Sequence, residues 1–298
     1  MEQVEKIDTV RQYNDHVGVD TLHPLVSVVK FDDLGAIGNF RKYMGIYAVF
    51  LKDNHCGNIL YGGQPYDYED GTLVFVAPAQ VYGIDNHTVN ENPRGYALLF
   101  HPDLLLGTAL AKKMKEYSFF SYEVNEALHL SKKERKIMGD LLDKMRSEIE
   151  QNIDHHSKTL ILSYIELFLN YCVRFYDRQF ITRSHINKVI LIKFENLLNE
   201  YFQSDKCQTL GVPTVSWCAD QLNLSPNYFG DLIKKETGNT ALDYIQTRVI
   251  DEAKTMIFDN EKTLSEIAFH LGFKYHQHFT RFFKNKVGVT PNEYRNLN

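Results

Sequence analysis

A run of polar side chains near the C-terminal end of the sequence has the composition and spacing needed to read nucleic acid. Five of them recur at intervals that place them on one face of a helix: His276, Gln277, Thr280, Arg281 and Lys284. Arginine forms two hydrogen bonds to guanine and glutamine forms two to adenine, whereas lysine pairs with phosphate. We therefore expect Arg281 and Gln277 to read bases, and we expect Lys284 and Lys286 to contact phosphate.

Other kinds of chemistry lack the residues they need. His276 and His278 are two positions apart on the expected helix, so their rings point in different directions and do not form a metal site. The cysteines are far apart, without the C-x-x-C pair of a zinc site or the spacing of a disulfide framework: Cys56, Cys172, Cys207 and Cys218. Neither a nucleophile elbow nor a phosphate-binding loop is present. We expect no catalytic residue, no metal, no cofactor, and mostly buried thiols.

An internal repeat positions the polar residues. Ala219–Leu224 aligns with Ala268–Phe273, and the alignment continues after a one-residue insertion in the turn. The later pairs match in residue type: Phe229 with Phe279, Leu232 with Phe282, Ile233 with Phe283, Lys234 with Lys284, and Gly238 with Gly288. We expect three phenylalanines of the second copy in the core: Phe279, Phe282 and Phe283. The repeat predicts two helix-turn-helix units.

Local signals mark where the helices of each unit begin and end. They are Ser225-Pro226 at a helix start, Gly238 and Gly288 at left-handed helix ends, and Thr240-x-x-Asp243 and Thr290-x-x-Glu293 as capping boxes. Tyr275 stands at the Ser225 position of the second unit and offers no obvious cap. Residues 241–258 read as one long helix between the units. Such a rigid connection suits two second helices that enter successive major-groove segments, about 34 Å apart.

The first unit presents a different set of side chains on the equivalent helix. Its candidate DNA contacts are Asn227, Tyr228, Asp231, Lys234 and Lys235. Asn227 can read adenine. Asp231 occupies the place of Arg281, and two alternatives are open for it. It either faces DNA, where it can accept a hydrogen bond from cytosine, or it pairs with Lys234 or Lys235 within the helix.

The N-terminal part of the chain changes from strand to helix. Short runs rich in aromatic and β-branched residues are typical of a small antiparallel barrel or sandwich: 45–51, 57–61, 72–76 and 96–100. Two amphipathic helices are predicted after them, 131–151 with a capping box at Ser131 and 157–176. The apolar pattern lapses near residues 178–184. We therefore expect domains at 1–180 and 184–298 and a homodimer through one of the two helices.

Composition and charge limit the classes of protein further. The 298 residues are 44% hydrophobic and 24% charged, which is typical of globular domains. The net charge of −5 lies in the first part of the chain, because residues 184–298 contain 13 basic and 13 acidic residues. No apolar run is long enough to cross a membrane, and the N-terminus has no secretory signal, so we expect a cytoplasmic protein without membrane partners.

The second unit resembles the AraC family of bacterial transcription regulators. The matching residues are Ile267-Ala268, Leu271-Gly272-Phe273, Phe279-Thr280-Arg281-x-Phe283-Lys284 and Gly288-x-Thr290-Pro291-x-Glu293-Tyr294-Arg295. The resemblance extends over 215–295 and departs at Asp231, where family members usually carry Arg or Lys. It implies a sensing or dimerising N-terminal domain, frequently cupin-like. Residues 71–82 look like the second cupin motif, but Tyr82 replaces its metal-binding His and only His55 lies near the first motif.

These observations together predict an α+β protein. A cupin-like antiparallel β-barrel with flanking helices would precede an all-α domain with two helix-turn-helix units joined by a long helix. The protein would bind double-stranded promoter DNA, form a homodimer and respond to a small-molecule effector, and RNA polymerase is a further candidate partner. Six tyrosines are candidates for lining an effector pocket in the barrel, although tyrosines in barrels are more often structural: Tyr43, Tyr47, Tyr61, Tyr66, Tyr68 and Tyr82. An alternative is a non-catalytic interaction module with degenerate DNA binding, which Asp231 and the neutral charge favour.

Overall fold

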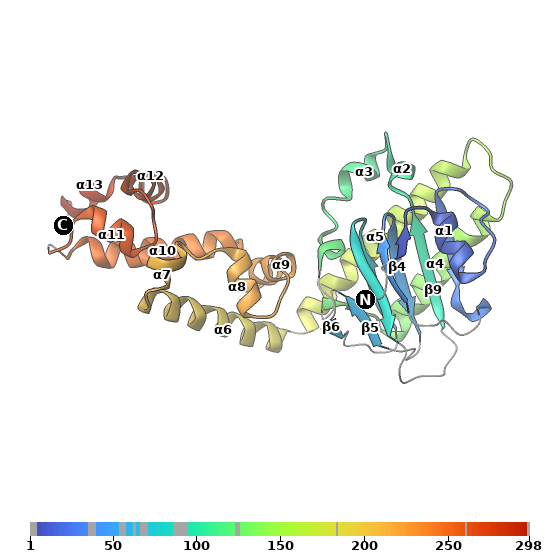
Figure 1. Cartoon of the computed structure of the whole chain (residues 1–298), viewed down its shortest axis with the longest axis horizontal. Coiled ribbons are helices and arrows are strands. Elements are labelled where there is room, and N and C mark those ends of the chain that lie inside the picture. Colours follow the sequence, from blue (N-terminus) through green and yellow to red (C-terminus); the bar gives the residue numbers. More distant parts are fainter. Residues whose placement is uncertain are drawn as a thin grey trace. The chain divides into compact units, whose positions relative to one another are not determined.

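The chain folds into two compact units, Met1–Thr182 and Arg183–Asn298, in the computed structural model drawn in Figure 1. The structure describes residues 5–34, 40–53, 58–61, 64–65, 71–85, 94–122, 126–182, 184–259 and 261–296. Of the residues considered above, Cys56, His55, Tyr66 and Tyr68 lie outside these ranges. No helix within the ranges is long and apolar enough to cross a membrane.

Two five-stranded sheets form the framework of the first unit. The first sheet has the order β1 (Glu5–Ile7), β3 (Phe40–Met44), β8 (Gln80–Asp85), β5 (Asn58–Tyr61) and β6 (Gln64–Pro65). The second has the order β10 (Leu128–His129), β7 (Thr72–Val76), β4 (Tyr47–Lys52), β9 (Gly95–Phe100) and β2 (Val26–Lys30). Neighbouring strands are antiparallel except β1 and β3. The four predicted strands are confirmed as β4, β5, β7 and β9. Within the described ranges the strands form two sheets and not one closed barrel.

An aromatic and aliphatic core fills the space between the two sheets. Phe50 of β4 stacks on Tyr82 of β8, with 4.6 Å between the ring centroids. Helix α1 (Val10–Val17) adds Val10 and Tyr13 to the same buried cluster. On the other face of the second sheet, α4 (Lys132–Ile149) contacts β2 and β9, and α5 (Ser157–Thr182) contacts β10. Both faces of the second sheet are therefore covered, and β9 is buried along its whole length.

Helices α4 and α5 agree with the sequence pattern, with one difference at the end of α5. Ser131 caps α4 in a capping box with Glu134, as predicted. Helix α5 continues to Thr182, past the end expected at residue 176. The side chain of Gln179 explains the extension, because it accepts a hydrogen bond from the His129 N–H at 2.8 Å and donates one to the Ala127 carbonyl at 2.8 Å. The unit also contains short elements: η1 (Phe31–Asp33), α2 (Pro102–Leu105), α3 (Ala109–Lys113) and η2 (Ser118–Ser121).

The second unit is entirely helical in the ranges described. Its helices are α6 (Ser184–Gln203), α7 (Lys206–Leu210), α8 (Val215–Gln221), α9 (Pro226–Thr237), α10 (Ala241–Ile257), α11 (Leu264–His270), α12 (His276–Val287) and α13 (Pro291–Asn296). The predicted caps are confirmed: Ser225 accepts from the Tyr228 N–H at 3.2 Å, and Gly238 and Gly288 are left-handed. The pairs α8–α9 and α11–α12 are the two expected helix-turn-helix units.

Helix α10 belongs to the cores of both helix-turn-helix units. Near its start, Tyr244 contacts the ring of Phe194 in α6 at 5.3 Å. Near its end, Ile250 and Ile257 join the cluster around Phe279 and Phe283. Seventeen helical residues span about 25 Å. Helix α10 therefore separates the two helix-turn-helix units by a fixed length, and side-chain packing holds it at both ends.

Candidate nucleic-acid interface

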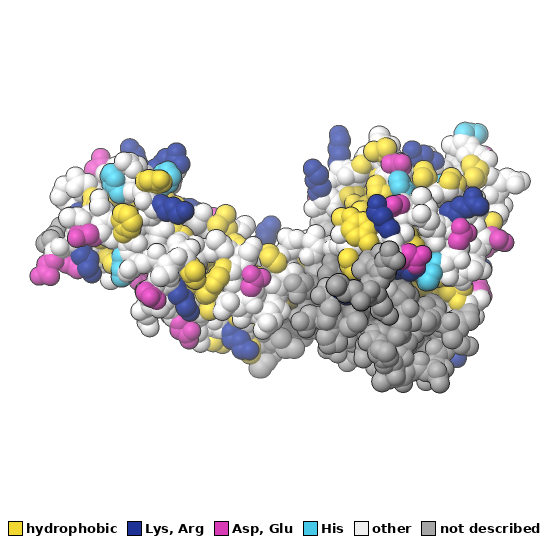
Figure 2. Space-filling view, in the orientation of Figure 1, with side chains coloured by type: hydrophobic (Ala, Val, Ile, Leu, Met, Phe, Trp, Pro, Cys, Tyr) yellow, Lys and Arg dark blue, Asp and Glu magenta, His cyan; other side chains and the backbone are white. Residues whose placement is uncertain are grey.

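Helix α12 has one buried face and one exposed polar face. Phe279 and Phe283 are fully buried, and Phe282 is half-buried against the same cluster. The polar residues predicted from helical spacing are exposed except Thr280, which is half-buried: His276, Gln277, Thr280, Arg281 and Lys284. The hydroxyl of Thr280 donates to the His276 carbonyl at 3.0 Å. Figure 2 shows Lys, Arg and His side chains gathered over this helix.

The start of α12 is more open than the start of α9. Tyr275 is 60% exposed and makes no side-chain cap, whereas Ser225 is 2% exposed and caps α9. Unsatisfied N–H groups at a helix start carry partial positive charge and suit an anion such as phosphate. The two helix-turn-helix units therefore differ in how their second helix is capped, because Tyr275 replaces Ser225 in the repeat.

Helix α9 presents fewer of its predicted contacts to solvent. Asn227, Lys234 and Lys235 are exposed, and Asp231 is half-buried. Tyr228 differs from these residues, because it is only 6% exposed. Its assignment as a DNA contact is therefore less favoured by the structure than that of Asn227, Lys234 and Lys235.

Lys286 has a partner inside the protein. Its ammonium lies 3.0 Å from the Asp243 carboxylate in the first turn of α10. A hydrogen bond from Thr240 and the charge of Lys286 lower the pKa of Asp243. The pair connects the last turn of α12 to the opposite end of α10, across 43 residues of sequence. Sequence reasoning assigned Lys286 to phosphate alone and gave no signal for this contact.

A second connection fixes the turn between α11 and α12. Gly272 has a φ of +90° in that turn and lies directly against the chain after α7. A Cβ atom added there would meet three backbone atoms, Gly211 C at 2.5 Å, Cys207 O at 2.7 Å and Val212 N at 2.7 Å. Tyr201 holds the same segment by donating to the Gly211 carbonyl at 2.9 Å. The position of the second helix-turn-helix unit therefore depends on a backbone contact that only glycine allows.

The two cysteines of residues 183–298, Cys207 and Cys218, are buried and have a structural role. Burial raises the pKa of Cys207 to about 11 and that of Cys218 to about 12, so both remain neutral thiols at physiological pH. In the part of the chain that the structure describes, no three His, Cys, Asp or Glu residues form a cluster suited to a metal ion. The geometry of the unit therefore points to an extended polar surface on two helices.

Comparisons with known proteins agree with this geometry. A family model described as a helix-turn-helix domain matches residues 218–297. The chain is 34% identical over 83 residues to an uncharacterized HTH-type transcriptional regulator, YobQ, from Bacillus subtilis, a match that covers 28% of this chain and 34% of that protein. The chain thus spans about a third of the length of this relative.

Two further matches are to a transposon protein and to a solved domain. The TetD protein of transposon Tn10 from Escherichia coli is 32% identical over 143 residues, which cover 48% of this chain and 91% of that protein. Among solved structures, the C-terminal domain of the two-component response regulator yesN from Fusobacterium nucleatum is 27% identical, with a TM-score of 0.31. That match covers 34% of this chain and 93% of the other.

Proposed function

Because the chain belongs to the AraC family of transcription regulators, we propose that α9 and α12 bind two successive major-groove segments of one promoter duplex. The second unit is a DNA-binding domain of helix-turn-helix type, and this assignment favours a regulator over an interaction module without DNA binding. The observation that carries the proposal is the exposed polar face of α12 above the buried Phe279 and Phe283. Base edges in the major groove are read by side chains displayed on one face of such a helix.

The roles we assign to the side chains follow from their donors and acceptors. In α12, Arg281 reads guanine and Gln277 reads adenine, and Lys284 contacts phosphate. The remaining proposed contacts of this helix are His276, Thr280 and Lys286, the last of which would exchange Asp243 for phosphate. In α9, Asn227 reads adenine, and Lys234 and Lys235 contact phosphate. Asp231 remains in two alternative roles, facing cytosine or supporting α9.

The length of α10 supports binding to successive segments. Successive major-groove segments on one side of a duplex are about 34 Å apart, and the 17 residues of α10 are about 25 Å long. The two helix-turn-helix units pack at the two ends of this helix, so its length is of the order that two successive segments require. The packing of Tyr244 and Ile257 at the two ends keeps this separation constant.

Replacement of Arg281 tests the reading of bases. The Arg281→Ala protein should lose about 1–3 kcal/mol of specific binding, and selection of sites from random DNA should show relaxed choice at one base pair. Arg11→Ala is the matched control, since Arg11 is an exposed arginine on α1 of the other unit. An equal loss of affinity for specific and random DNA would assign Arg281 to phosphate instead.

We also propose that the first unit, residues 1–180, is a cupin-like sensing and dimerisation domain. Helix α5 supports a homodimer because it is apolar on two faces. Its inner face, including Ile161, Phe168 and Phe175, is buried. On the outer face Leu160 is 44% and Leu167 46% exposed, and half-buried Tyr164 and Tyr171 alternate with them at the four-three spacing of paired helices. The apolar stripe of α4, by contrast, is buried within the subunit.

The two facing sheets support the cupin-like part of the proposal, and they also limit where an effector can bind. The described space between the sheets is filled by Phe50, Tyr82 and Tyr13, which belong to one buried cluster. Tyr82, one of the six candidate pocket tyrosines, is therefore part of the packing. An effector site at the surface of this unit would regulate promoter binding, either directly or through contacts with RNA polymerase.

A further inference from the structure

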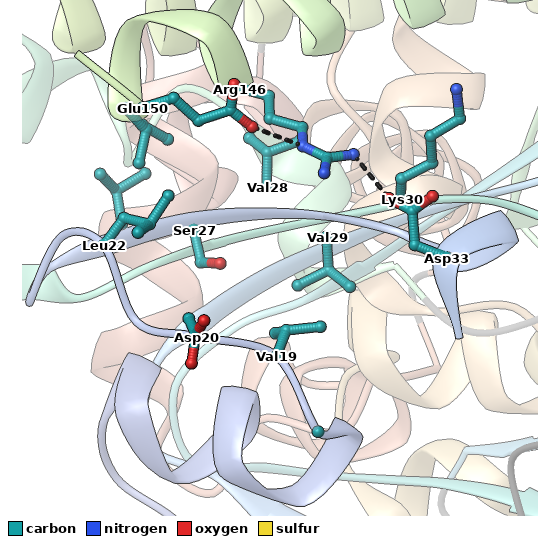
Figure 3. A pocket seen from close by; sticks show the side chains of 13 residues that line it. Val19, Asp20, Leu22, Ser27, Val28, Val29, Lys30, Asp33, Arg146 and Glu150 are labelled. Carbon is teal, nitrogen blue, oxygen red and sulfur yellow. Dashed lines mark hydrogen bonds and ion pairs between the residues drawn. The ribbon is translucent and has the colours of Figure 1, made fainter. Parts of the chain in front are cut away.

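A groove runs along the free edge of strand β2 in the first unit. Among the described strands β2 ends the second sheet, where it pairs with β9 alone. The groove is lined by all five β2 residues, by the connection Gly18–Leu22 and by Arg146, Ile149 and Glu150 of α4, and has a volume of about 340 Å³. Figure 3 shows β2 crossing the view between α4 on one side and α1 with its connection on the other. We call this site the edge groove.

The hydrogen-bond register shows which backbone groups face the edge groove. The His101 N–H donates to the Leu25 carbonyl at 2.8 Å. Bonded and non-bonded pairs alternate along an antiparallel ladder, so Ser27 and Val29 also bond to β9. Val26, Val28 and Lys30 therefore direct their N–H and C=O groups away from β9. The floor of the groove offers alternating main-chain donors and acceptors.

The walls of the groove are held in place without a ligand. Helix α1 ends at Gly18, whose φ of +77° turns the chain back along β2. The side-chain amide of buried Asn14 then donates to Thr21 at 3.1 Å and fixes the connection. On the opposite wall, Arg146 donates to Asp33 at 2.8 Å and to Glu150 at 3.0 Å.

Ser27 is the feature that points to a ligand. Its side chain lines the groove, as that of Asp20 does, and the residue is only 8% exposed (Figure 3). Its hydroxyl makes no hydrogen bond to any residue within the described ranges, so its donor and its acceptor are available on the groove side. A ligand in the groove would supply both a donor and an acceptor for it.

The charges around the groove favour a cationic ligand. Three carboxylates line it, Asp20, Asp33 and Glu150, against two cations. Both cations are engaged, since Arg146 binds Asp33 and Glu150, and the ammonium of Lys30 lies 5.6 Å from the centre of the Tyr96 ring. Asp20 lies on the wall opposite Arg146, exposed and without an ion pair among the described residues.

We infer that the edge groove binds a short free peptide with a basic side chain, which adds to β2 as a further strand. The edge of β2 supplies the main-chain hydrogen bonds, Ser27 binds the peptide backbone, and Asp20 binds the basic side chain. A second copy of this chain does not fit the same place, because its own β2 is recessed between α4 and the α1 connection. The peptide would be the effector of the proposed regulator. Its role in regulation therefore rests on the proposed function, whereas its binding to the edge groove does not.

Binding is tested with an equimolar library of acetylated, amidated pentapeptides and the full chain. We expect retained peptides to contain Lys or Arg. Hydrogen exchange of the Val28 and Lys30 amides should slow on binding, whereas the Ser27 and Val29 amides, already bonded to β9, should not change. N-methylation at alternate peptide residues in one of the two registers should abolish binding, since it removes the donors that face β2.

Variants separate this site from general attraction of cations. Asp20→Asn should weaken binding about two- to fivefold, and Ser27→Ala about two- to tenfold. Asp15→Asn, on the exposed surface of α1, is the control and should have no effect. Failure of the library to yield any binder, or binding that tolerates N-methylation in both registers, would overturn the inference. Peptide binding that leaves promoter affinity unchanged would confirm the site and refute only its role as effector site.

Discussion

The contact at Gly272 leads to a prediction about the stability of the DNA-binding unit. Replacement by alanine adds one Cβ atom at a residue whose φ is +90°. A left-handed conformation costs a residue with a side chain about 1–2 kcal/mol. The new atom would also overlap Gly211, Cys207 and Val212, all through backbone atoms that cannot rotate away. Overpacking of this kind costs about a further 1–3 kcal/mol.

Gly288→Ala is a matched control for the conformational part of this cost. Gly288 has a φ of +93°, close to that of Gly272, but a Cβ atom there meets nothing within 4 Å. We therefore expect Gly272→Ala to lower the free energy of unfolding by about 1–3 kcal/mol more than Gly288→Ala does. Subtraction of the two values isolates the contact with the segment after α7.

Trp217 makes the measurement specific to this unit. It is the single tryptophan of the chain, and its ring lies 4.6 Å from that of Tyr201, which holds the Gly211 carbonyl. Urea unfolding followed by tryptophan fluorescence therefore reports on the second unit alone, and the slope and midpoint give the free energy. Equal losses for the two alanine variants would refute the argument, because the backbone contact would then contribute nothing.

Three other predictions concern charge, assembly and pH. Asp231→Arg should strengthen non-specific DNA binding and steepen its salt dependence by up to about one phosphate equivalent if Asp231 faces DNA, whereas weaker binding with a lower melting temperature would indicate a supporting role in α9. Leu167→Glu should convert a dimer of the full chain to monomer in sedimentation at micromolar concentration, and a wild-type monomer would refute the α5 interface. Hydrogen bonds from the Thr263 and Thr290 backbone lower the pKa values of Glu266 and Glu293. The stability that these carboxylates add is therefore present above about pH 4.5 and is lost as the pH falls through the folded pKa values. Glu266→Gln should lower the urea midpoint at pH 7, and this difference from the unchanged chain should shrink as the pH falls below 4.5.

The second unit was more predictable from sequence than the first because its signals are local. Ser225, Gly238 and Gly288 define helix boundaries through contacts within a few residues, and the structure places the boundaries there. In the first unit, β4 lies between β7 and β9, although β7 is separated from it along the chain by β5 and β6. Pairing of this kind depends on which buried faces fit together across the sheet, and no spacing rule determines it.

In the candidate site, too, the features set within one helix could be predicted from the sequence, whereas those set by contacts between helices could not. Helical spacing placed Arg281 and Gln277 on an exposed face because the periodicity of one helix is sufficient for that. The burial of Tyr228, by contrast, depends on contacts of α9 with other parts of the chain, which the spacing within one helix does not give. The partners of Lys286 and Gly272 belong to other helices, so only the folded chain brings them together.

Residues 184–298 carry no net charge, and this is compatible with DNA binding because many of their acidic side chains are engaged within the protein. Several of them cap helices: the carboxylate of Asp243 accepts from the Thr240 hydroxyl, that of Glu266 from the Thr263 N–H and that of Glu293 from the Thr290 N–H. Others pair with a basic residue of the same element, such as Glu252 with Arg248. None lies between residues 274 and 286 along the chain, where four basic residues gather, and only Lys286 of these four is paired with a carboxylate among the described residues. Because salt screens charges beyond about 10 Å, a phosphate beside α12 is influenced chiefly by this local excess and not by the total. The strength of non-specific binding should therefore depend on the sequence of α12 far more than on the overall charge of the domain.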